Sequence, residues 1–291
     1  MITLFSTPKN FTGIFSHIQL NALRSWRSIS PDIQIIIFGD SKGSQEAALG
    51  IKADYIPKVR CSQKGTPYAS DLFKQAKELA RFPILTFINA DIILPNNFLN
   101  SVSLVSNSFS NYLMIGHRWD REVDECIDFE NSEKNELFWN KFKNEGEMHA
   151  PSGIDYFVFN KDLWKSIPDF IIGRPGFDNW LVWKARRKLI PVVDASEEMI
   201  VVHQNHHFNF HNLKVDPKTN PEEEGESNKK IHGGKTLNIL DSTYKLEGNS
   251  IKKKNNKEFK VRNLHRLPSI FPEFSILIKL YRRLYRLFLP K

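Results

Sequence analysis

Apolar residues in the first half of the chain form short continuous runs, separated by segments in which they recur at helical spacing. Because these runs are apolar on both faces, they are typical of strands inside a parallel sheet. We expect strands at 2–6, 33–38, 53–59, 83–88, 112–116 and 156–159. Residues 14–28 and 68–80 have helical spacing and are predicted as helices. Alternating strands and helices predict an α/β fold with a mostly parallel sheet flanked by helices.

The pattern changes in the second half. Residues 120–131 are acidic and typical of a loop, whereas 177–188 has the spacing of a helix. Short strands are expected at 190–193 and 199–202. Residues 205–235 are polar and predict a mobile loop over a site, because structureless segments of this length in compact domains are usually functional or disordered.

Composition excludes several classes of protein. With 291 residues, 41% hydrophobic and 25% charged, the chain is neither wholly disordered, nor a collagen, nor a multi-span membrane protein. Cys61 and Cys126 are too few for a disulfide framework or a cysteine-rich zinc site, and we expect free thiols. Polar Thr3 and Ser6 interrupt the N-terminal apolar segment, so no signal peptide is expected and the protein should be cytoplasmic.

The positive charge is concentrated at the C-terminus. Residues 251–291 hold 12 of the 41 Lys and Arg but only 2 of the 33 Asp and Glu, which leaves the remainder with a net charge of −2. A basic tail on a nearly neutral body indicates an added surface-binding element rather than a nucleic-acid-binding domain.

The sharpest candidate for chemistry is Asn89-Ala90-Asp91, where the strand predicted at 83–88 ends. Ligands of open parallel sheets bind beyond the carboxyl ends of the strands. A carboxylate there can hold Mg²⁺ or Mn²⁺ against a diphosphate. These polar residues can equally serve the turn before Pro95.

Three more residues are candidate contacts for a nucleotide. Thr7 and Asp40 follow the first and second strands, and Asp40 is suited to accept hydrogen bonds from a nucleobase or ribose. A simple Gly-Asp turn also explains Asp40. Asp71 either stabilises the start of its helix or reaches the same crevice.

A Gly/Pro-rich loop runs into the helix that contains Asp178. Acidic residues are favoured in a first helical turn, which gives Asp178 a structural explanation. A carboxylate after such a loop is also well placed as a general base. Arg174 in the loop is a candidate for binding phosphate.

Four histidines, His203, His206, His207 and His211, follow the strand predicted at 199–202. Imidazole is a common metal ligand, but the spacing matches no dedicated zinc site. We expect His203 or His206 to join Asp91 on a divalent cation, with His203 preferred because it directly follows the strand.

The order of these motifs resembles that of GT-A-type, family-2-like glycosyltransferases of the nucleotide-diphospho-sugar transferase superfamily. The resemblance spans roughly residues 2–240 and rests on Asp40, Asn89-Ala90-Asp91, Ser152-Gly153-Ile154-Asp155, Gly176-Phe177-Asp178-Asn179-Trp180 and His203-Gln204-Asn205-His206. It implies a Rossmann-like nucleotide-sugar half (1–118), an acceptor half (119–250) and an appended tail (251–291).

The resemblance also implies roles. An Asp-x-Asp motif holds the Mn²⁺ or Mg²⁺ bound to the diphosphate of the sugar nucleotide; here Asn89 replaces the first carboxylate, which leaves Asp91 as the direct ligand. Asp40 would face the nucleobase, and Asp178 would be the base of an inverting transfer. The implied activity moves a sugar from a nucleotide-diphosphate sugar to a glycan or lipid-linked acceptor.

Other functions remain open from the sequence. A sugar-phosphate nucleotidyltransferase would need a glycine-rich phosphate loop after the first strand, and residues 6–13 contain one glycine. A metal-dependent hydrolase usually has a denser set of ligands. A non-catalytic adaptor that binds membranes through the basic tail is the third alternative.

The tail itself predicts an amphipathic helix. One stripe is apolar, and a second is basic: Phe274, Leu277, Ile278, Tyr281, Leu284, Tyr285 and Phe288 against Lys279, Arg282, Arg283 and Arg286. Such a helix lies in the interface of an anionic membrane, which would place the protein at the inner face of the membrane. Packing of the apolar stripe on the protein's own body is the alternative.

Overall fold

The computed structural model describes residues 1–206, 221–278, 280 and 283. Most of its strands belong to one large sheet: β1 (Ile2–Ser6), β2 (Gln34–Phe38), β3 (Asp54–Ile56), β4 (Ile84–Ile88), β6 (Leu113–Ile115), β9 (Tyr156–Asn160), β10 (Val192–Asp194), β12 (Tyr244–Glu247) and β13 (Ser250–Lys253). In the described chain this sheet has nine strands, in the order β13-β12-β10-β6-β9-β4-β1-β2-β3.

Most neighbours in the sheet are parallel. β1 pairs in parallel with both β2 and β4, and only the pairings made by β9 and by β13 are antiparallel. The predicted α/β fold with a mostly parallel sheet is thus confirmed.

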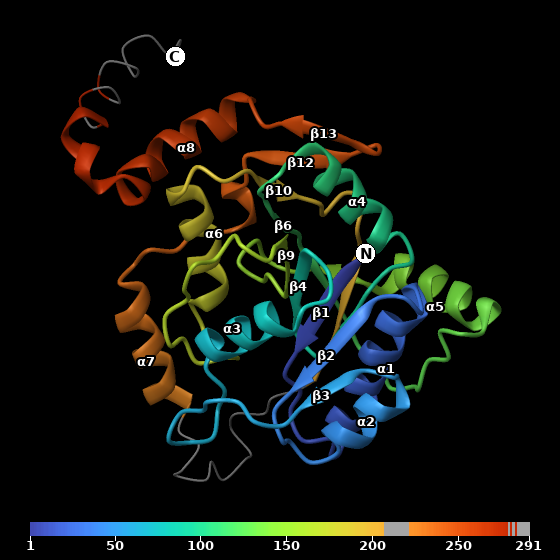
Figure 1. Ribbon diagram of the computed structural model, residues 1–291. Helices are drawn as coiled ribbons and strands as arrows, with labels where there is room; N and C mark the ends of the chain where they lie inside the picture. The colour runs from blue at the N-terminus through green and yellow to red at the C-terminus, as the bar shows by residue number, and fades with distance from the viewer. Residues whose placement is uncertain (207–220, 279, 281–282, 284–291) are drawn as a thin grey trace.

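Helices cover both faces of the sheet (Figure 1). Their bounds are α1 (Ile14–Ile29), α2 (Ser44–Gly50), α3 (Ala69–Leu79), α4 (Phe98–Ser108), α5 (Ser132–Glu145), α6 (Phe177–Arg187), α7 (Pro221–His232) and α8 (Lys257–Ile270), with short 3-10 helices η2 (Ile239–Asp241) and η3 (Pro272–Phe274). One core contains side chains of α3 and α6, and the other contains side chains of α1, α2 and α4.

Successive side chains along the strands point alternately into these two cores. Phe5 and Phe87 join the first core, while their neighbours Leu4 and Ile88 join the second. Successive side chains of a strand point to opposite faces, so a continuous apolar run is what a sheet covered on both sides requires.

A second, smaller sheet is a feature that the sequence did not predict. It consists of β5 (Ile92–Ile93), β7 (Arg118–Arg121), β8 (Glu147–Met148) and β11 (Val201–Gln204), in the order β5-β11-β7-β8. The strand expected at 199–202 corresponds to β11, whereas β5, β7 and β8 are short and β7 is polar, so no periodicity identifies those three. The expected loop at 120–131 therefore begins inside a strand, and α5 follows it.

The mobile loop expected at 205–235 is partly wrong, because α7 occupies Pro221–His232. Residues 207–220 of that prediction lie outside the described residues. Proline at the start, acidic Glu222–Glu224 in the first turn and basic residues in the last turn all suit a helix and its dipole. Polar composition concealed these local signals.

The C-terminal segment begins inside the sheet, because the expected boundary between 250 and 251 falls within β13. α8 then packs beside α6, and the Trp183 indole donates a hydrogen bond to the Ser269 carbonyl at 3.0 Å. Ile270 is fully buried, whereas Phe274 and Leu277 are exposed. Tail positions 279, 281–282 and 284–291 lie outside the described residues, and no described helix is long and apolar enough to span a bilayer.

Candidate metal centre

Thr7, Asp40 and Asp91 lie at the carboxyl edge shared by the parallel strands β1, β2 and β4. Gly39 turns the chain after β2 with a φ of +94°, a conformation that favours glycine. A Cβ atom on Gly39 would lie 3.3 Å from Thr7 Oγ1, so Thr7 packs directly against this turn. The edge is where an open parallel sheet binds ligands.

Two histidines converge on Asp91. His206 Nε2 lies 3.2 Å from Asp91 Oδ2, and His203 Nε2 lies 3.7 Å from the same oxygen. Asp91 immediately precedes β5, and β5 pairs with β11 so that Ile92 is opposite His203. The structure therefore brings together all three residues predicted as metal ligands, although more than 100 residues of sequence separate Asp91 from the histidines.

These three groups could hold a divalent cation. One potential ligand atom from each of Asp91, His203 and His206 lies within 4.8 Å of the others. Asp91 Oδ1 is buried and accepts no hydrogen bond from the residues that the structure describes. Burial would raise the pKa of Asp91, but His206, His203 and Lys9 together lower it below its usual value. The carboxylate is thus held ionised, as a metal ligand must be.

Buried amides fix the backbone around this cluster. The Gln204 side-chain amide donates hydrogen bonds to the carbonyls of Asp91 at 3.0 Å and Ile18 at 2.7 Å. Its oxygen in turn accepts from the Asn21 amide at 3.1 Å. Both amide side chains are buried, so β11 and the end of β4 are held in one arrangement relative to α1.

A second row of charged residues lies behind the cluster. Arg118 is paired with Asp120 and with Asp155, each at 3.0 Å. The Asn89 amide donates to Asp155 Oδ1 at 2.5 Å. Asn89 therefore helps to hold the Asp155 carboxylate in place.

Asp178 lies in the first turn of α6, close to the same charges. Burial and, after it, the negative charge of Asp155 raise the pKa of Asp178 to about 8, although the positive charge of Arg118 opposes them. The side chain remains partly exposed. A carboxylate with this pKa can accept a proton near neutral pH, which is the property of a general base.

Lys9 and Arg174 supply positive charge near Asp91. Burial lowers the pKa of Lys9, the Asp91 carboxylate counteracts this, and nearby Arg174 adds to the lowering. Arg174 is also held by Glu224 of α7, with 2.7 Å between Nη2 and Oε2. Both cations are suited to contact a phosphate.

Asp40 and Asp71 lie on the other side of the edge, around Cys61. Burial raises the pKa of the Cys61 thiol, and Asp40 and then Asp71 raise it further. Asp71 Oδ2 accepts hydrogen bonds from the Arg60 backbone at 2.7 Å and the Gln75 amide at 2.8 Å. Asp71 thus stabilises the loop before α3, while Asp40 is exposed and open to a ligand.

Sequence reasoning missed Lys9, Arg118, Asp120 and His149. Asp120 and Arg118 lie on β7, which carries too few residues for a recognisable alternation. His149 is isolated in the sequence and contacts Asp120 only because β7 pairs with β8. The charged residues of Arg-Trp-Asp-Arg at 118–121 were the one available signal, and they show no regular alternation.

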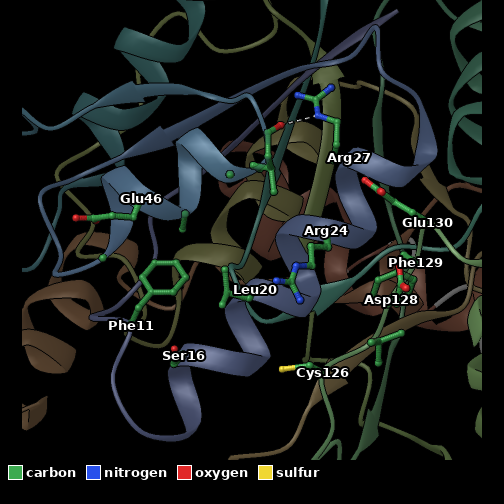
Figure 2. A pocket seen from close by; sticks show the side chains of 15 residues that line it. Phe11, Ser16, Leu20, Arg24, Arg27, Glu46, Cys126, Asp128, Phe129 and Glu130 are labelled. Atoms are coloured by element: carbon green, nitrogen blue, oxygen red, sulfur yellow. Dashed lines mark hydrogen bonds between the residues drawn. The ribbon is translucent and has the colours of Figure 1, made fainter.

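A pocket of about 790 Å³ lies elsewhere, between α1, α2 and the segment 126–130. Figure 2 shows its wall, with Phe11, Leu20 and Phe129 among the lining side chains and Cys126 at one side. Neither Asp91, nor the two histidines, nor Asp178 lines it. The chemistry-bearing residues are therefore found by their position in the sheet and not by this pocket.

No protein-family model matches the sequence, and no curated protein matches it. Solved structures of glucosyl-3-phosphoglycerate synthase from Mycobacterium tuberculosis resemble the chain. One, in complex with Mn²⁺, UDP and phosphoglyceric acid, is 14% identical with a TM-score of 0.48, covering 80% of this chain and 78% of its own. Another, with Mg²⁺ and UDP, is 15% identical with a TM-score of 0.43, covering 71% of this chain and 72% of its own. Similarity this distant assigns no activity to the chain, so the function is argued from the site.

Proposed function

We propose that the chain is a metal-assisted glycosyltransferase that takes a sugar from a nucleotide-diphosphate donor. The observation that carries the proposal is the convergence of Asp91, His203 and His206 at the carboxyl edge of the parallel strands. Asp178 lies close enough to the second row of charges, Asp155 and Arg118, for their fields to act on it. A divalent-cation site and a base then flank one edge of the sheet.

The residues fit a divalent cation by their chemistry. A bound Mn²⁺ or Mg²⁺ would stabilise the negative charge that develops on a departing diphosphate. Asp91, His203 and His206 would hold the ion. Two imidazoles and one carboxylate favour Mn²⁺ over the harder Mg²⁺, which prefers oxygen ligands. Lys9 and Arg174 would add positive charge on the side of the phosphates.

Asp178 is the proposed base. It would accept the proton of the acceptor hydroxyl as that oxygen forms its bond to the sugar, which gives inversion at the anomeric carbon. Thr7 and Asp40 would contact the nucleoside, because they end β1 and β2 beside the cluster. The acceptor class we propose is a glycan or a lipid-linked precursor of a surface polysaccharide.

The direct test is a binding and hydrolysis screen. Thermal stabilisation of the full chain is measured with UDP, GDP and CMP, each with and without Mn²⁺, and hydrolysis is then followed with the corresponding sugar nucleotides. We expect at least one nucleotide to stabilise the chain only with Mn²⁺, and Asp91→Ala to lose this effect. Asp124→Ala, which changes an exposed residue, is the control. Stabilisation by no nucleotide, or equal stabilisation of Asp91→Ala, would contradict the proposal.

A lipid-linked acceptor is supported by the C-terminal apolar patch, which we define as Phe274, Ile276, Leu277 and Leu280. Their exposed fractions range from 54% to 81%, so within the described chain this patch is not packed on the body. Residues 272–291 carry five basic residues and one acidic residue. An exposed apolar surface in a basic segment is suited to the interface of an anionic bilayer.

Co-sedimentation with vesicles tests this membrane contact. The truncated variant should end at Phe271, because an earlier end would remove buried Ile270 or β13. We expect the full chain, but not the truncated chain, to bind vesicles of equal parts phosphatidylglycerol and phosphatidylcholine at low salt. Equal binding by both chains, or by neither, would contradict it.

A further inference from the structure

The small sheet aligns three functional groups across neighbouring strands. In the parallel pair β7–β11, Asp120 is opposite His203. In the antiparallel pair β11–β5, His203 is opposite Ile92, the residue that follows Asp91. Side chains at paired positions share a face, so the register itself directs Asp120 toward His203.

Contacts confirm that Asp120 faces two histidines and an arginine. Asp120 Oδ1 lies 3.1 Å from His203 Nδ1, and Oδ2 lies 2.6 Å from His149 Nδ1. Arg118 Nε lies 3.0 Å from Oδ1. Oδ2 is hydrogen-bonded to His149, and Oδ1 lies within ion-pair distance of both Arg118 and His203.

We propose that Asp120 is the positioning residue of the metal centre: lying 3.1 Å from His203 Nδ1, it keeps the ring proton on that nitrogen and thereby leaves the lone pair of Nε2 for the cation shared with Asp91. Metal-bound histidines almost always donate their other ring N–H to such a partner, which fixes the tautomer and the ring orientation. A neutral ring bound in this way directs an electron pair at the Asp91 carboxylate, 3.7 Å away. A divalent cation between Nε2 and this carboxylate would satisfy both acceptors.

His149 supports Asp120 from the other side, and the local backbone makes room for it. A Cβ atom on Gly153 would lie 2.3 Å from His149 Cδ2, so glycine at 153 is what allows the ring to reach Asp120. Gly153 therefore affects the proposed metal site only indirectly, by leaving room for His149, which contacts Asp120.

This inference rests on the proposed metal site, and binding of Mn²⁺ alone to the full chain tests it. We expect Asp120→Ala to weaken Mn²⁺ binding about 10- to 100-fold, the range found when such partners are removed. Asp120→Asn keeps an oxygen that accepts the Nδ1 proton, and we expect it to lose much less. Asp124→Ala is the control for loss of one negative charge on the same segment.

A spectroscopic readout separates positioning from general structural support. Long-range ¹H–¹⁵N spectra of the metal-free chain, at a pH where the ring is neutral, should show the Nδ1–H tautomer of His203, assigned with His203→Gln. Asp120→Ala should shift the tautomer, while Asp120→Asn should preserve it. If Asp120→Ala does not fold, the wild-type spectrum decides, since the Nε2–H tautomer of His203 would overturn the role of Asp120.

The outcomes distinguish this inference from the proposed function. Wild-type Mn²⁺ affinity and an unchanged tautomer in Asp120→Ala would overturn the role of Asp120 and leave the metal site standing. Absence of Mn²⁺ binding in the wild-type chain, with or without nucleotide, would instead overturn the metal site. In that case the tautomer measurement would still decide whether Asp120 orients His203.

Discussion

Asp178 has a raised pKa that lowers stability and also suits the general base that we propose. Its carboxylate is held in the first turn of α6 where burial and Asp155 disfavour the charge. The first turn of a helix favours an acid, and that explains why a carboxylate is tolerated there but not why its charge is opposed. A group whose charge is so opposed is typical of a functional site.

Activity should depend on the protonation of Asp178. With a pKa of about 8, the carboxylate is mostly protonated at pH 6 and becomes a competent base as the pH rises. We expect kcat/KM to increase with pH up to about 8, and Asp178→Asn to lower turnover about 10²- to 10⁴-fold, as removal of a general base does. Near-normal turnover by this variant would reduce Asp178 to a helix-start residue.

Stability should change in the opposite sense. Between the usual pKa of 3.8 and the folded-state value of about 8, the folded protein holds a proton that the unfolded chain has released. Stability from this group therefore falls as the pH rises through that range. Asp178→Asn should raise the melting temperature, and by more at pH 8 than at pH 5. A pH-independent difference in scanning calorimetry would contradict the raised pKa.

Among the helices, α7 holds together two loops that border the candidate site. Glu224 is nearly buried, pairs with Arg174, and accepts hydrogen bonds from the hydroxyls of Ser62 at 2.5 Å and Thr66 at 3.1 Å. α7 thereby ties the loop before α3 to the loop before α6. Both loops border the edge that carries the proposed nucleotide contacts.

Two adjacent glutamates of α7 provide a matched test. Glu224, 5% exposed, pairs with Arg174, while Glu223, 76% exposed, pairs with Lys64. Breaking a buried pair leaves an uncompensated charge, so Glu224→Ala should cost about 3–5 kcal/mol of unfolding free energy. Glu223→Ala should lower the unfolding free energy far less, because exposed ion pairs contribute little. Chemical denaturation measures both, and equal costs would mean that α7 is not held by Glu224.

The elements that could be predicted are those whose pattern is local. β1, β2 and β4 are apolar runs, and α1, α3 and α6 have regular helical spacing. β5, β7 and β8 exist through pairing with β11, and a strand of two to four residues has no period to detect. The same reason limits what could be predicted of the candidate site. Asp91 and the histidines were found because they lie next to recognisable strands. Asp120 could not be found, because only the pairing of β7 with β11 brings it opposite His203.

In the whole molecule, the cluster of candidate metal ligands lies at one edge of a sheet whose two faces are covered by helices. The two cores hold β1, β2 and β4 in fixed register, and the second sheet brings β11 to the end of β4. At the far end of the chain, α8 packs against α6 before the C-terminal apolar patch begins. We propose that Asp91, His203 and His206 hold the cation that the transfer requires.

Isothermal titration of Mn²⁺ and Mg²⁺ into the full chain, with and without the stabilising nucleotide, tests that claim most directly. We expect one Mn²⁺ per chain, weaker binding of Mg²⁺ because imidazole is a poor ligand for it, and tighter Mn²⁺ binding when the nucleotide is present. Asp91→Ala should abolish this Mn²⁺ binding while keeping the wild-type fold. Equal Mn²⁺ binding by the wild-type chain and Asp91→Ala, or no binding by the wild-type chain even with nucleotide, would contradict the account.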